Sequence, residues 1–289
     1  MIIVKIIGGL GNQMFQYAYA KSLQERGNNV KIDLSAFETY ILHGGYQLDK
    51  YNIDLECTIN EENNIYYQNS LLNKVLKKLK FYKDKTIQEQ SLLYDKSLLN
   101  VKDDNYINGY FQSEKYFKNI RDSLIEQFTI KQGVSDYTNK IKAAILDSKN
   151  SCSIHIRRGD FTSPTNSKIH GTCDLEYYKK AINFVNNKFD SVKYFIFSDD
   201  INWCKENLKL DNSIYLDSEE KRIPHEDIYL MSLCNHNIIA NSSFSWWGAW
   251  LNKNDEKIVI APKRWFASDD LEIYSNDIVC DNWIKVKDD

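Results

Sequence analysis

The chain has 289 residues with a formal net charge of −3, and aromatic residues make up 13% of it. Because nucleic-acid binding requires a basic face, this charge balance argues against a nucleic-acid partner. The length suits two domains of about 140 residues, each able to bury its own core. The aromatic content fits sugar stacking and ordinary core packing equally well.

The six cysteines show no C-x-x-C pairing, and several lie in apolar runs: Cys57, Cys152, Cys173, Cys204, Cys234 and Cys280. This pattern is typical of reduced, buried thiols in a cytosolic protein. There is no signal-peptide pattern, and no run reaches the roughly 18 apolar residues of a membrane span. We therefore expect a cytoplasmic protein. A lysine-bearing helix predicted at 71–83 is an alternative means of peripheral attachment to the inner face of the membrane. The favoured interpretation is that its lysines face the solvent.

The N-terminal part begins with alternating elements and then loses its regularity. An apolar strand at 2–7 leads through a glycine turn at 8–11 into a helix at 12–25, and a second strand follows at 29–33. Beyond this point the pattern loosens. Helical spacing of apolar residues reappears in three segments: 71–83, 113–128 and 136–148.

The C-terminal part alternates regularly between strands and helices. Strands are predicted where short apolar runs occur: 152–156, 193–197, 213–216, 237–240 and 257–260. Helices are predicted between them: 174–188, 200–208, 226–234 and 245–252. Helical crossovers of this length imply a parallel sheet. We expect a domain boundary between about residues 130 and 150, since the regular alternation starts there.

The most informative stretch is C-S-I-H-I-R-R-G-D-F, residues 152–161. A buried strand there delivers His155, two arginines and Asp160 at its carboxyl end, where open α/β sheets bind ligands. Arg157 and Arg158 need an anion, and the planar guanidinium suits pairs of phosphate oxygens. The alternative is a structural ion pair of one of these arginines with Asp160.

The glycine turn G-G-L-G-N-Q, residues 8–13, is the second constellation. It allows a ligand to approach the main chain closely, and the following helix N-terminus offers free N–H groups. A dinucleotide site is one alternative, because Asp33 ends the second strand, but Met14 occupies the position of that motif's third glycine. A plain tight turn is the other.

The third constellation runs from His225 to Trp250. Its apolar segment 238–240 is followed by Asn241, Ser242 and Ser243, and hydroxyls at a strand-to-helix turn suit a phosphate. The simpler alternative is that a serine only caps the next helix. The run Y-F-I-F-S-D-D, ending at Asp200, is another strand with polar groups at its end.

Metal and nucleophilic chemistry have little support in the sequence. It contains no D-x-D triplet, no H-E-x-x-H motif, no cysteine–histidine cluster and no G-x-S-x-G elbow. We expect no metal and no cofactor. A site that handles pyrophosphate without Mg²⁺ must supply positive charge itself, and Arg157 and Arg158 are the candidates.

Four motifs in order carry a resemblance to a known family: G-G-L-G-N-Q-M-F-Q-Y-A, H-I-R-R-G-D-F, Y-F-I-F-S-D-D and I-I-A-N-S-S-F-S-W-W-G-A-W. They resemble the bacterial α-1,2-fucosyltransferases of glycosyltransferase family 11. The resemblance spans residues 8 to about 265 and is weakest between about 34 and 130. It implies an α/β fold of the GT-B type with two Rossmann-like domains. Residues 1–140 would form the acceptor side, and 141–289 would bind GDP-fucose.

The resemblance also implies roles for individual residues. His155 and Asp227 would recognise guanine, and Arg157 would bind the β-phosphate. Asn12 resembles the asparagine that protein-O-fucosyltransferases place near the reacting sugar. The remaining donor-binding candidates are Arg158, Asp199, Ser242, Ser243, Phe244, Gly9, Gly11 and Gln13.

The implied reaction is an inverting displacement on GDP-fucose by the 2-hydroxyl of a terminal galactoside. The acceptor would be a galactose-terminated oligosaccharide or glycolipid of a bacterial surface glycan. Asp160 is a candidate base, and the alternatives are that it orients an arginine or that the leaving phosphate accepts the proton. A fucosyltransferase of different linkage or acceptor, or a non-catalytic nucleotide-sugar-binding protein, stays open. Nothing in the sequence specifies the acceptor core type or an oligomeric state.

Overall fold

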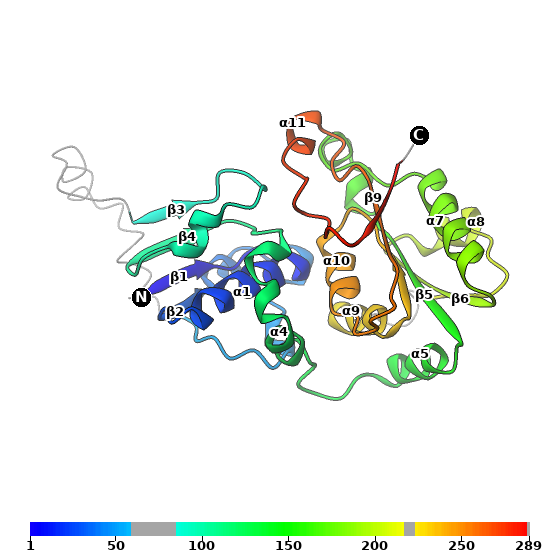
Figure 1. Ribbon diagram of the computed structural model, residues 1–289, viewed down its shortest axis with the longest axis horizontal. Coiled ribbons are helices and arrows are strands. Elements are labelled where there is room, and N and C mark those ends of the chain that lie inside the picture. The colour runs from blue at the N-terminus through cyan, green and yellow to red at the C-terminus, as the bar shows by residue number, and fades with distance from the viewer. Residues whose placement is uncertain (59–84, 217–222, 288–289) are drawn as a thin grey trace. The chain divides into compact units, whose positions relative to one another are not determined.

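A computed structural model describes residues 1–58, 85–216 and 223–287. The chain divides into two compact units, Met1–Thr129 and Ile130–Asp289, each with its own sheet and helices (Figure 1). This division falls before the predicted residue 140, because helix α5 (Asp136–Leu146) packs against α9 (Pro224–Leu233) of the second unit. The helix predicted at 71–83 lies outside the described residues.

The first unit is built on a parallel sheet of order β2-β1-β4-β3. Its strands are β1 (Ile2–Lys5), β2 (Val30–Asp33), β3 (Thr86–Gln88) and β4 (Asn105–Asn108), and its longer helices are α1 (Leu10–Glu25) and α4 (Arg121–Gln127). The predictions located β1, β2 and α1. They missed β3 and β4, because strands as short as T-I-Q and N-Y-I-N carry too few apolar residues to show a pattern.

Helix α1 is buried on nearly every face, and its polar side chains are satisfied within the unit. Asp54 accepts hydrogen bonds from the Tyr17 hydroxyl at 3.1 Å and from Lys21 Nζ at 2.8 Å. Gln127 Nε2, at the end of α4, donates to the same carboxylate at 2.9 Å. This polar network fixes α1 against α4 and the loop that carries Asp54.

The prediction of one helix over 113–128 is wrong in its first half. Two 3-10 turns, Glu114–Tyr116 and Lys118–Ile120, precede α4. Phe117 separates them with φ −142° and ψ 1°, which is not helical. Its ring is 1% exposed and lies 5.9 Å from that of Phe15. Core packing of Phe117 therefore overrides the helical spacing of the sequence.

The second unit contains a parallel six-stranded sheet of order β10-β9-β8-β5-β6-β7. Its strands are β5 (Asn150–Ile156), β6 (Val192–Ser198), β7 (Ser213–Tyr215), β8 (His236–Ile238), β9 (Val259–Pro262) and β10 (Ile284–Val286). Its helices are α5, α6 (Asn166–Ile169), α7 (Leu175–Lys188), α8 (Ile201–Asn207), α9, α10 (Ser243–Trp250) and α11 (Asp269–Glu272). The predictions located all of these except β10, α6 and α11, with boundaries shifted by a few residues.

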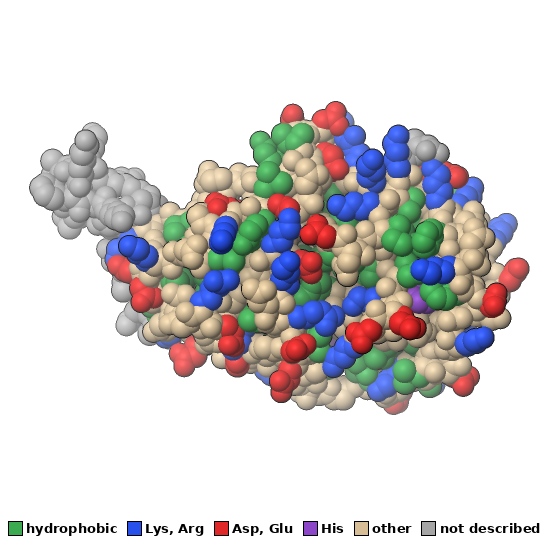
Figure 2. All heavy atoms as spheres, viewed as in Figure 1, with side chains coloured by type: hydrophobic (Ala, Val, Ile, Leu, Met, Phe, Trp, Pro, Cys, Tyr) green, Lys and Arg blue, Asp and Glu red, His purple; other side chains and the backbone are tan. Residues whose placement is uncertain are grey.

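The two parallel sheets confirm the predicted fold class, an α/β protein of the GT-B type. Side chains of both charge signs are interspersed over the face shown in Figure 2, consistent with the small net charge. Within the described ranges, no helix combines the length and apolar character that crossing a bilayer requires.

Glu226 fastens α5 to α9 inside the second unit. Its side chain is buried and accepts hydrogen bonds from Ser135 N at 3.0 Å, Ser135 Oγ at 2.7 Å and Thr138 Oγ1 at 2.6 Å. Burial alone would raise the pKa of Glu226, but these hydrogen bonds from Thr138 and Ser135 hold it below its ordinary value. The folded unit therefore favours the ionised carboxylate.

Replacing Glu226 by Gln should lower the free energy of unfolding at pH 7 by about 1–3 kcal/mol, the scale for hydrogen bonds to a charged group. Because the folded-state pKa is lowered, this stabilisation is present above the ordinary carboxyl pKa and is lost as the pH falls through the lowered value. Urea unfolding at pH 7 and about pH 3 measures the difference. The exposed Glu206→Gln is the control. An equal effect of Glu226→Gln at both pH values would contradict the assignment.

Candidate functional site

The second unit brings two predicted motifs together at the carboxyl edge of its sheet. Strand β5 pairs with β6 on one side and β8 on the other, with Ile154 opposite Ile238. The chain proceeds from β5 toward β7 at one edge and returns through β8 to β10 at the other. Ligands of open α/β sheets bind where the strand order reverses in this way. The segments that begin at Arg157 and Asn241 both follow strands at this point.

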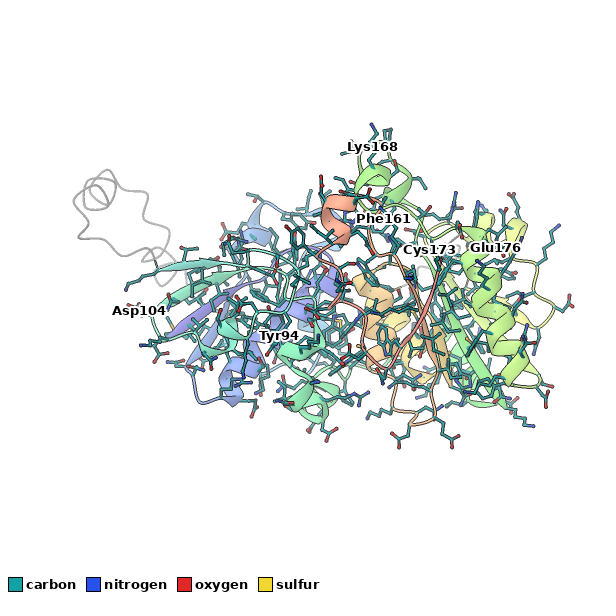
Figure 3. All side chains as sticks on the ribbon, turned by 45° about the horizontal axis from the view of Figure 1, so that its top comes forward. Tyr94, Asp104, Phe161, Lys168, Cys173 and Glu176 are labelled. Carbon is teal, nitrogen blue, oxygen red and sulfur yellow. The ribbon has the colours of Figure 1, made fainter. Side chains whose placement is uncertain are left out.

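Arg157 is held between two carboxylates. Its Nη2 lies 2.6 Å from Asp160 Oδ1, and its Nη1 lies 2.9 Å from Asp199 Oδ2. The guanidinium carbon also lies 5.5 Å from the centre of the Phe161 ring, and Figure 3 labels Phe161 in the segment after β5. The side chain remains 27% exposed. The Arg157–Asp160 ion pair, which the sequence analysis gave as the structural alternative, therefore forms. The guanidinium is held in place and is still accessible at the edge of the sheet.

Arg158 has a different environment from Arg157. Its Nε lies 3.2 Å from Asp200 Oδ2, and its guanidinium carbon lies 4.1 Å from the centre of the Trp203 ring. Its main-chain N–H donates to Asp199 Oδ1 at 2.9 Å. Because Asp200 also caps α8, the Arg158 side chain ties the end of β5 to the start of that helix.

Gly159 makes the approach of Asp199 to Arg157 possible. A Cβ atom at this position would lie 2.6 Å from Asp199 Oδ2, well inside van der Waals contact. The glycine between Arg158 and Asp160 is therefore required by the space that the Asp199 carboxylate occupies.

The turn after β8 carries the other predicted donor residues. Ser242 caps α10, with its Oγ accepting from Phe244 N at 3.3 Å, so the capping alternative holds for this serine. Ser243 and Phe244 are partly exposed in the first turn of α10. The Phe244 ring lies 5.5 Å from that of His155, which is 4% exposed. Four predicted residues from two motifs therefore lie at or beside the start of α10.

Asp227 lies in the first turn of α9 and is 6% exposed. Its neighbour Glu226 points to α5, as described above.

Two residues that the predictions missed organise the loop that follows β5. Asn241 is 5% exposed and donates from Nδ2 to His170 O at 3.0 Å, Gly171 O at 3.2 Å and Trp265 O at 3.0 Å. The His170 ring stacks on Phe161 at 4.8 Å with an interplanar angle of 10°. Local sequence patterns predict neither role, because each depends on contacts that form only in the folded unit.

The His170 imidazole is a neutral group beside the charged cluster. Burial lowers its pKa below the ordinary value, and the Asp160 charge only partly opposes this effect. The ring therefore stays uncharged at neutral pH and can donate or accept a hydrogen bond.

In the first unit, the glycine turn is fixed by the amide of a buried glutamine. Gln13 Nε2 donates to Gly8 O and Gly45 O, each at 2.8 Å, and its Oε1 accepts from Gln47 N at 3.0 Å. Gly8 has φ +93°, which favours glycine. Gln13 is fully buried, so it holds the loop around residues 45–47 against the turn.

The other predicted residues of this turn surround Asn12. Its Oδ1 accepts from Gln112 Nε2 at 2.8 Å. Gly9 is partly exposed, whereas Gly11 is buried within α1. The structure therefore places the donor-binding candidates in two separate groups, one in each unit.

The arrangement places two guanidiniums, each paired with at least one carboxylate, at the carboxyl edge of the second unit's sheet. Among residues 1–58, 85–216 and 223–287, no three His, Cys, Asp or Glu side chains are grouped so that they could hold a metal ion. At the carboxyl end of β5, Arg157 and Arg158 supply positive charge.

Comparisons with known proteins identify the family of the chain. The profile of Glycosyl transferase family 11 matches residues 1–287. The chain belongs to glycosyltransferase family 11. An alpha-1,2-colitosyltransferase of Escherichia coli is 36% identical, with 99% of each chain covered. The Escherichia coli O-antigen biosynthesis glycosyltransferase WbnK is 32% identical over 96% of this chain and 98% of that one.

The family 11 chain also has solved structural neighbours. The fucosyltransferase NodZ from Bradyrhizobium superposes with a TM-score of 0.47 and 14% identity, over 86% of this chain and 91% of that one. Family membership makes the chain a glycosyltransferase.

Replacing Gly159 by Ala should lower glycosyl transfer by about 10- to 100-fold, the cost of misplacing a catalytic group by about 1 Å. The added methyl group displaces the Asp199 carboxylate, and Arg157 then loses one of its two anchors. Steady-state kinetics on protein with an unchanged circular dichroism spectrum measures the effect. Gly133→Ala is the matched control, because a Cβ there meets no atom within 4 Å. Turnover of Gly159→Ala within twofold of the wild type would contradict this role.

Proposed function

We propose that this family 11 glycosyltransferase transfers L-fucose from GDP-fucose to the 2-hydroxyl of a terminal galactoside, with inversion at the anomeric carbon. The observation that carries the proposal is the Arg157 guanidinium, fixed by two carboxylates and still exposed at the point where the strand order reverses. A rigid guanidinium there suits a diphosphate. The names of the relatives support a deoxysugar donor and an α-1,2 linkage.

The donor nucleotide is assigned to the carboxyl edge of the second unit. The partly exposed start of α10, with Ser243 and Phe244, offers main-chain N–H groups to phosphate oxygens. We assign guanine recognition to His155, Phe244 and Asp227, which are buried or partly buried on neighbouring elements. Arg158 and Asp199 act indirectly, because they fix the end of β5 and the Arg157 side chain.

The reaction requires stabilisation of charge on the leaving group. As the bond to the sugar breaks, negative charge grows on the departing GDP, and Arg157 binds this charge more strongly than the ground-state ester. Two carboxylates orient the guanidinium beforehand, so little reorganisation is needed. Arginine supplies the positive charge, and we propose that no metal ion is required.

In the first unit, we assign Asn12 to contact a sugar, with Gly9 and Gly11 allowing close approach of the main chain. Gln13 contributes by holding the glycine turn, since its amide is used by main-chain groups. The acceptor is a galactose-terminated oligosaccharide or glycolipid.

Transfer of colitose is the second candidate function. The 36% identity to an alpha-1,2-colitosyltransferase over 99% of both chains favours it. Colitose differs from fucose by the absence of one ring hydroxyl, so the same phosphate and guanine contacts serve both donors.

The proposal is tested by incubating the protein with GDP-fucose or GDP-colitose, in excess EDTA, with galactosides of differing core type. We expect transfer from GDP-fucose, and linkage analysis should show an α-1,2 bond. Transfer from GDP-colitose alone would select the second candidate. Activity that appears only on adding Mg²⁺ or Mn²⁺ would contradict the metal-independent site, and a different linkage would contradict the acceptor assignment.

Arg157→Ala should lower kcat by at least about 100-fold, the scale for removing one preorganised donor to a developing anion. Arg157→Lys should recover little of this loss, because a point charge cannot replace the two-pronged guanidinium. The exposed Arg26→Ala is the control for charge. Near-normal turnover of a folded Arg157→Ala protein would overturn the central assignment.

Asp227→Asn should weaken GDP binding by about 1–3 kcal/mol, the cost of an unsatisfied buried partner. An amide offers one acceptor atom where the guanine edge needs two. Calorimetric titration with GDP measures the loss, and the exposed Asp211→Asn is the control. Unchanged affinity in Asp227→Asn would transfer guanine recognition to other groups.

Asp160→Asn should reduce donor affinity and turnover together, because Asp160 anchors Arg157 at 2.6 Å. We propose this positioning role in place of that of general base. Hydrolysis of the donor without acceptor should therefore fall in step with transfer. Loss of transfer with intact donor affinity and intact hydrolysis would instead identify Asp160 as the base.

A further inference from the structure

The first unit has its own point of strand reversal, and the segment that follows β4 lies there. Strand β1 lies between β2 and β4, with Val4 opposite Ile107. The chain leads from β1 to β2 on one side, whereas β4 and β3 lie on the other. Two segments follow strands at this reversal: the glycine turn and residues 109–112. In an open parallel sheet, this position is where a ligand binds.

Two side-chain amides meet at this point. Gln112 Nε2 donates to Asn12 Oδ1 at 2.8 Å, across 100 residues of sequence. The bond fixes which way the Asn12 amide faces: its oxygen is turned to Gln112, and its NH₂ group lies over Gly8. A Cβ at Gly8 would be 3.1 Å from Asn12 Nδ2. Both amide side chains are partly exposed, so the pair presents an oriented hydrogen-bond donor.

The loop that carries Gln112 is rigid. Glu89, just after β3, accepts the main-chain N–H of Tyr110 at 2.6 Å and that of Phe111 at 3.1 Å. Gln16 Nε2, from α1, donates to Gly109 O at 3.0 Å. Every residue before Gln112 in this loop is therefore held through its main chain.

Phe111 shows how strongly the loop is constrained. Its φ is +53°, a left-handed conformation that residues other than glycine adopt at a cost. Its ring is fully buried and stacks on Tyr19 at 3.9 Å with an interplanar angle of 14°. Strained conformations of this kind persist where the surrounding structure determines them, and they cluster at ligand sites.

Tyr110 differs from its neighbours, because its side chain is 43% exposed while its main chain is clamped. The Glu89 carboxylate is occupied by main-chain N–H groups. The loop therefore offers an exposed aromatic ring on a held main chain, together with the amide of Gln112 and its partner Asn12. Amides match sugar hydroxyls, and an aromatic face matches the C–H face of a pyranose.

We propose that Tyr110 and Asn12 bind a neutral pyranose, and that Gln112 is a positioning residue that fixes the Asn12 amide. This inference rests on the proposed function and extends it to residues after β4. The pyranose is either the transferred sugar of the donor or the terminal sugar of the acceptor, since the recognising chemistry is the same.

The decisive variant is Gln112→Glu, which keeps the shape of the side chain. A carboxylate only accepts hydrogen bonds, so the Asn12 amide must turn its NH₂ group toward residue 112 and withdraw the donor from the ligand. Tyr110→Ala removes the ring without touching the clamped main chain. Gln132→Glu, an exposed glutamine of the second unit, is the matched control.

We expect Gln112→Glu to lower the kcat/KM of transfer about tenfold, the scale of one well-formed hydrogen bond. GDP affinity measured by calorimetry should stay within twofold, since the nucleotide binds elsewhere.

If the pyranose is the donor's, hydrolysis of the donor without acceptor falls equally. If it is the acceptor's, the KM for the galactoside rises and hydrolysis is unchanged. In an Asn12→Ala background, Gln112→Glu should have less than a twofold effect, because Gln112 acts through Asn12.

Wild-type kcat and KM in both Gln112→Glu and Tyr110→Ala would overturn the inference. An undiminished effect of Gln112→Glu in the Asn12→Ala background would overturn the positioning role.

Saturation-transfer NMR with methyl β-galactoside and methyl α-fucoside gives a readout independent of turnover. Loss of the saturation-transfer signal in Tyr110→Ala supports the sugar site. If the wild type shows this signal but uses neither donor, the proposed function fails and the sugar site stands. Equal signals in all variants, or none in the wild type together with no kinetic effect, overturn the inference.

Discussion

A guanidinium shared by two carboxylates is the interaction on which the second unit's site depends. Arg157 has both ends of its fork engaged, by Asp160 at 2.6 Å and Asp199 at 2.9 Å. Because the carboxylates come from the loop after β5 and the end of β6, the cation is fixed by two strands at once. A charge held in this way gains more from an incoming anion than a mobile one, since the ordering cost has already been met during folding.

The surrounding residues each protect that geometry. Gly159 leaves room for the Asp199 carboxylate, and the main-chain N–H of Arg158 fixes the same group. Asn241 ties the loop that bears His170 to the segment at Trp265. The geometry around Arg157 is thus supported by main-chain anchors and by contacts between side chains and main-chain groups. Substitutions of these supporting residues should act by changing the position of Arg157.

Sequence patterns predicted the carboxyl ends of the strands better than the contacts that form around them. The apolar run that becomes β5 ends in polar residues, and this contrast marks the carboxyl end of a buried strand even without a structure. The hydrogen bond between Gln112 and Asn12 joins residues that are 100 positions apart, and the sequence around either residue does not predict it. Phe117 shows the opposite problem, because its helical spacing is real but core packing gives it another conformation. Local patterns predict strands and turns, whereas long-range packing decides which side chains meet.

The clamp on the loop after β4 has a consequence for how new specificities arise. Glu89 holds residue 110 through its main-chain N–H, and every amino acid except proline supplies that group. Phe111 is locked by burial and by its left-handed backbone, so variation there is costly. Position 110 is therefore a place where evolution can exchange a side chain in one step without refolding the loop. With the sugar-binding role proposed for Tyr110, a substitution at this position changes sugar preference and leaves the second unit unaltered.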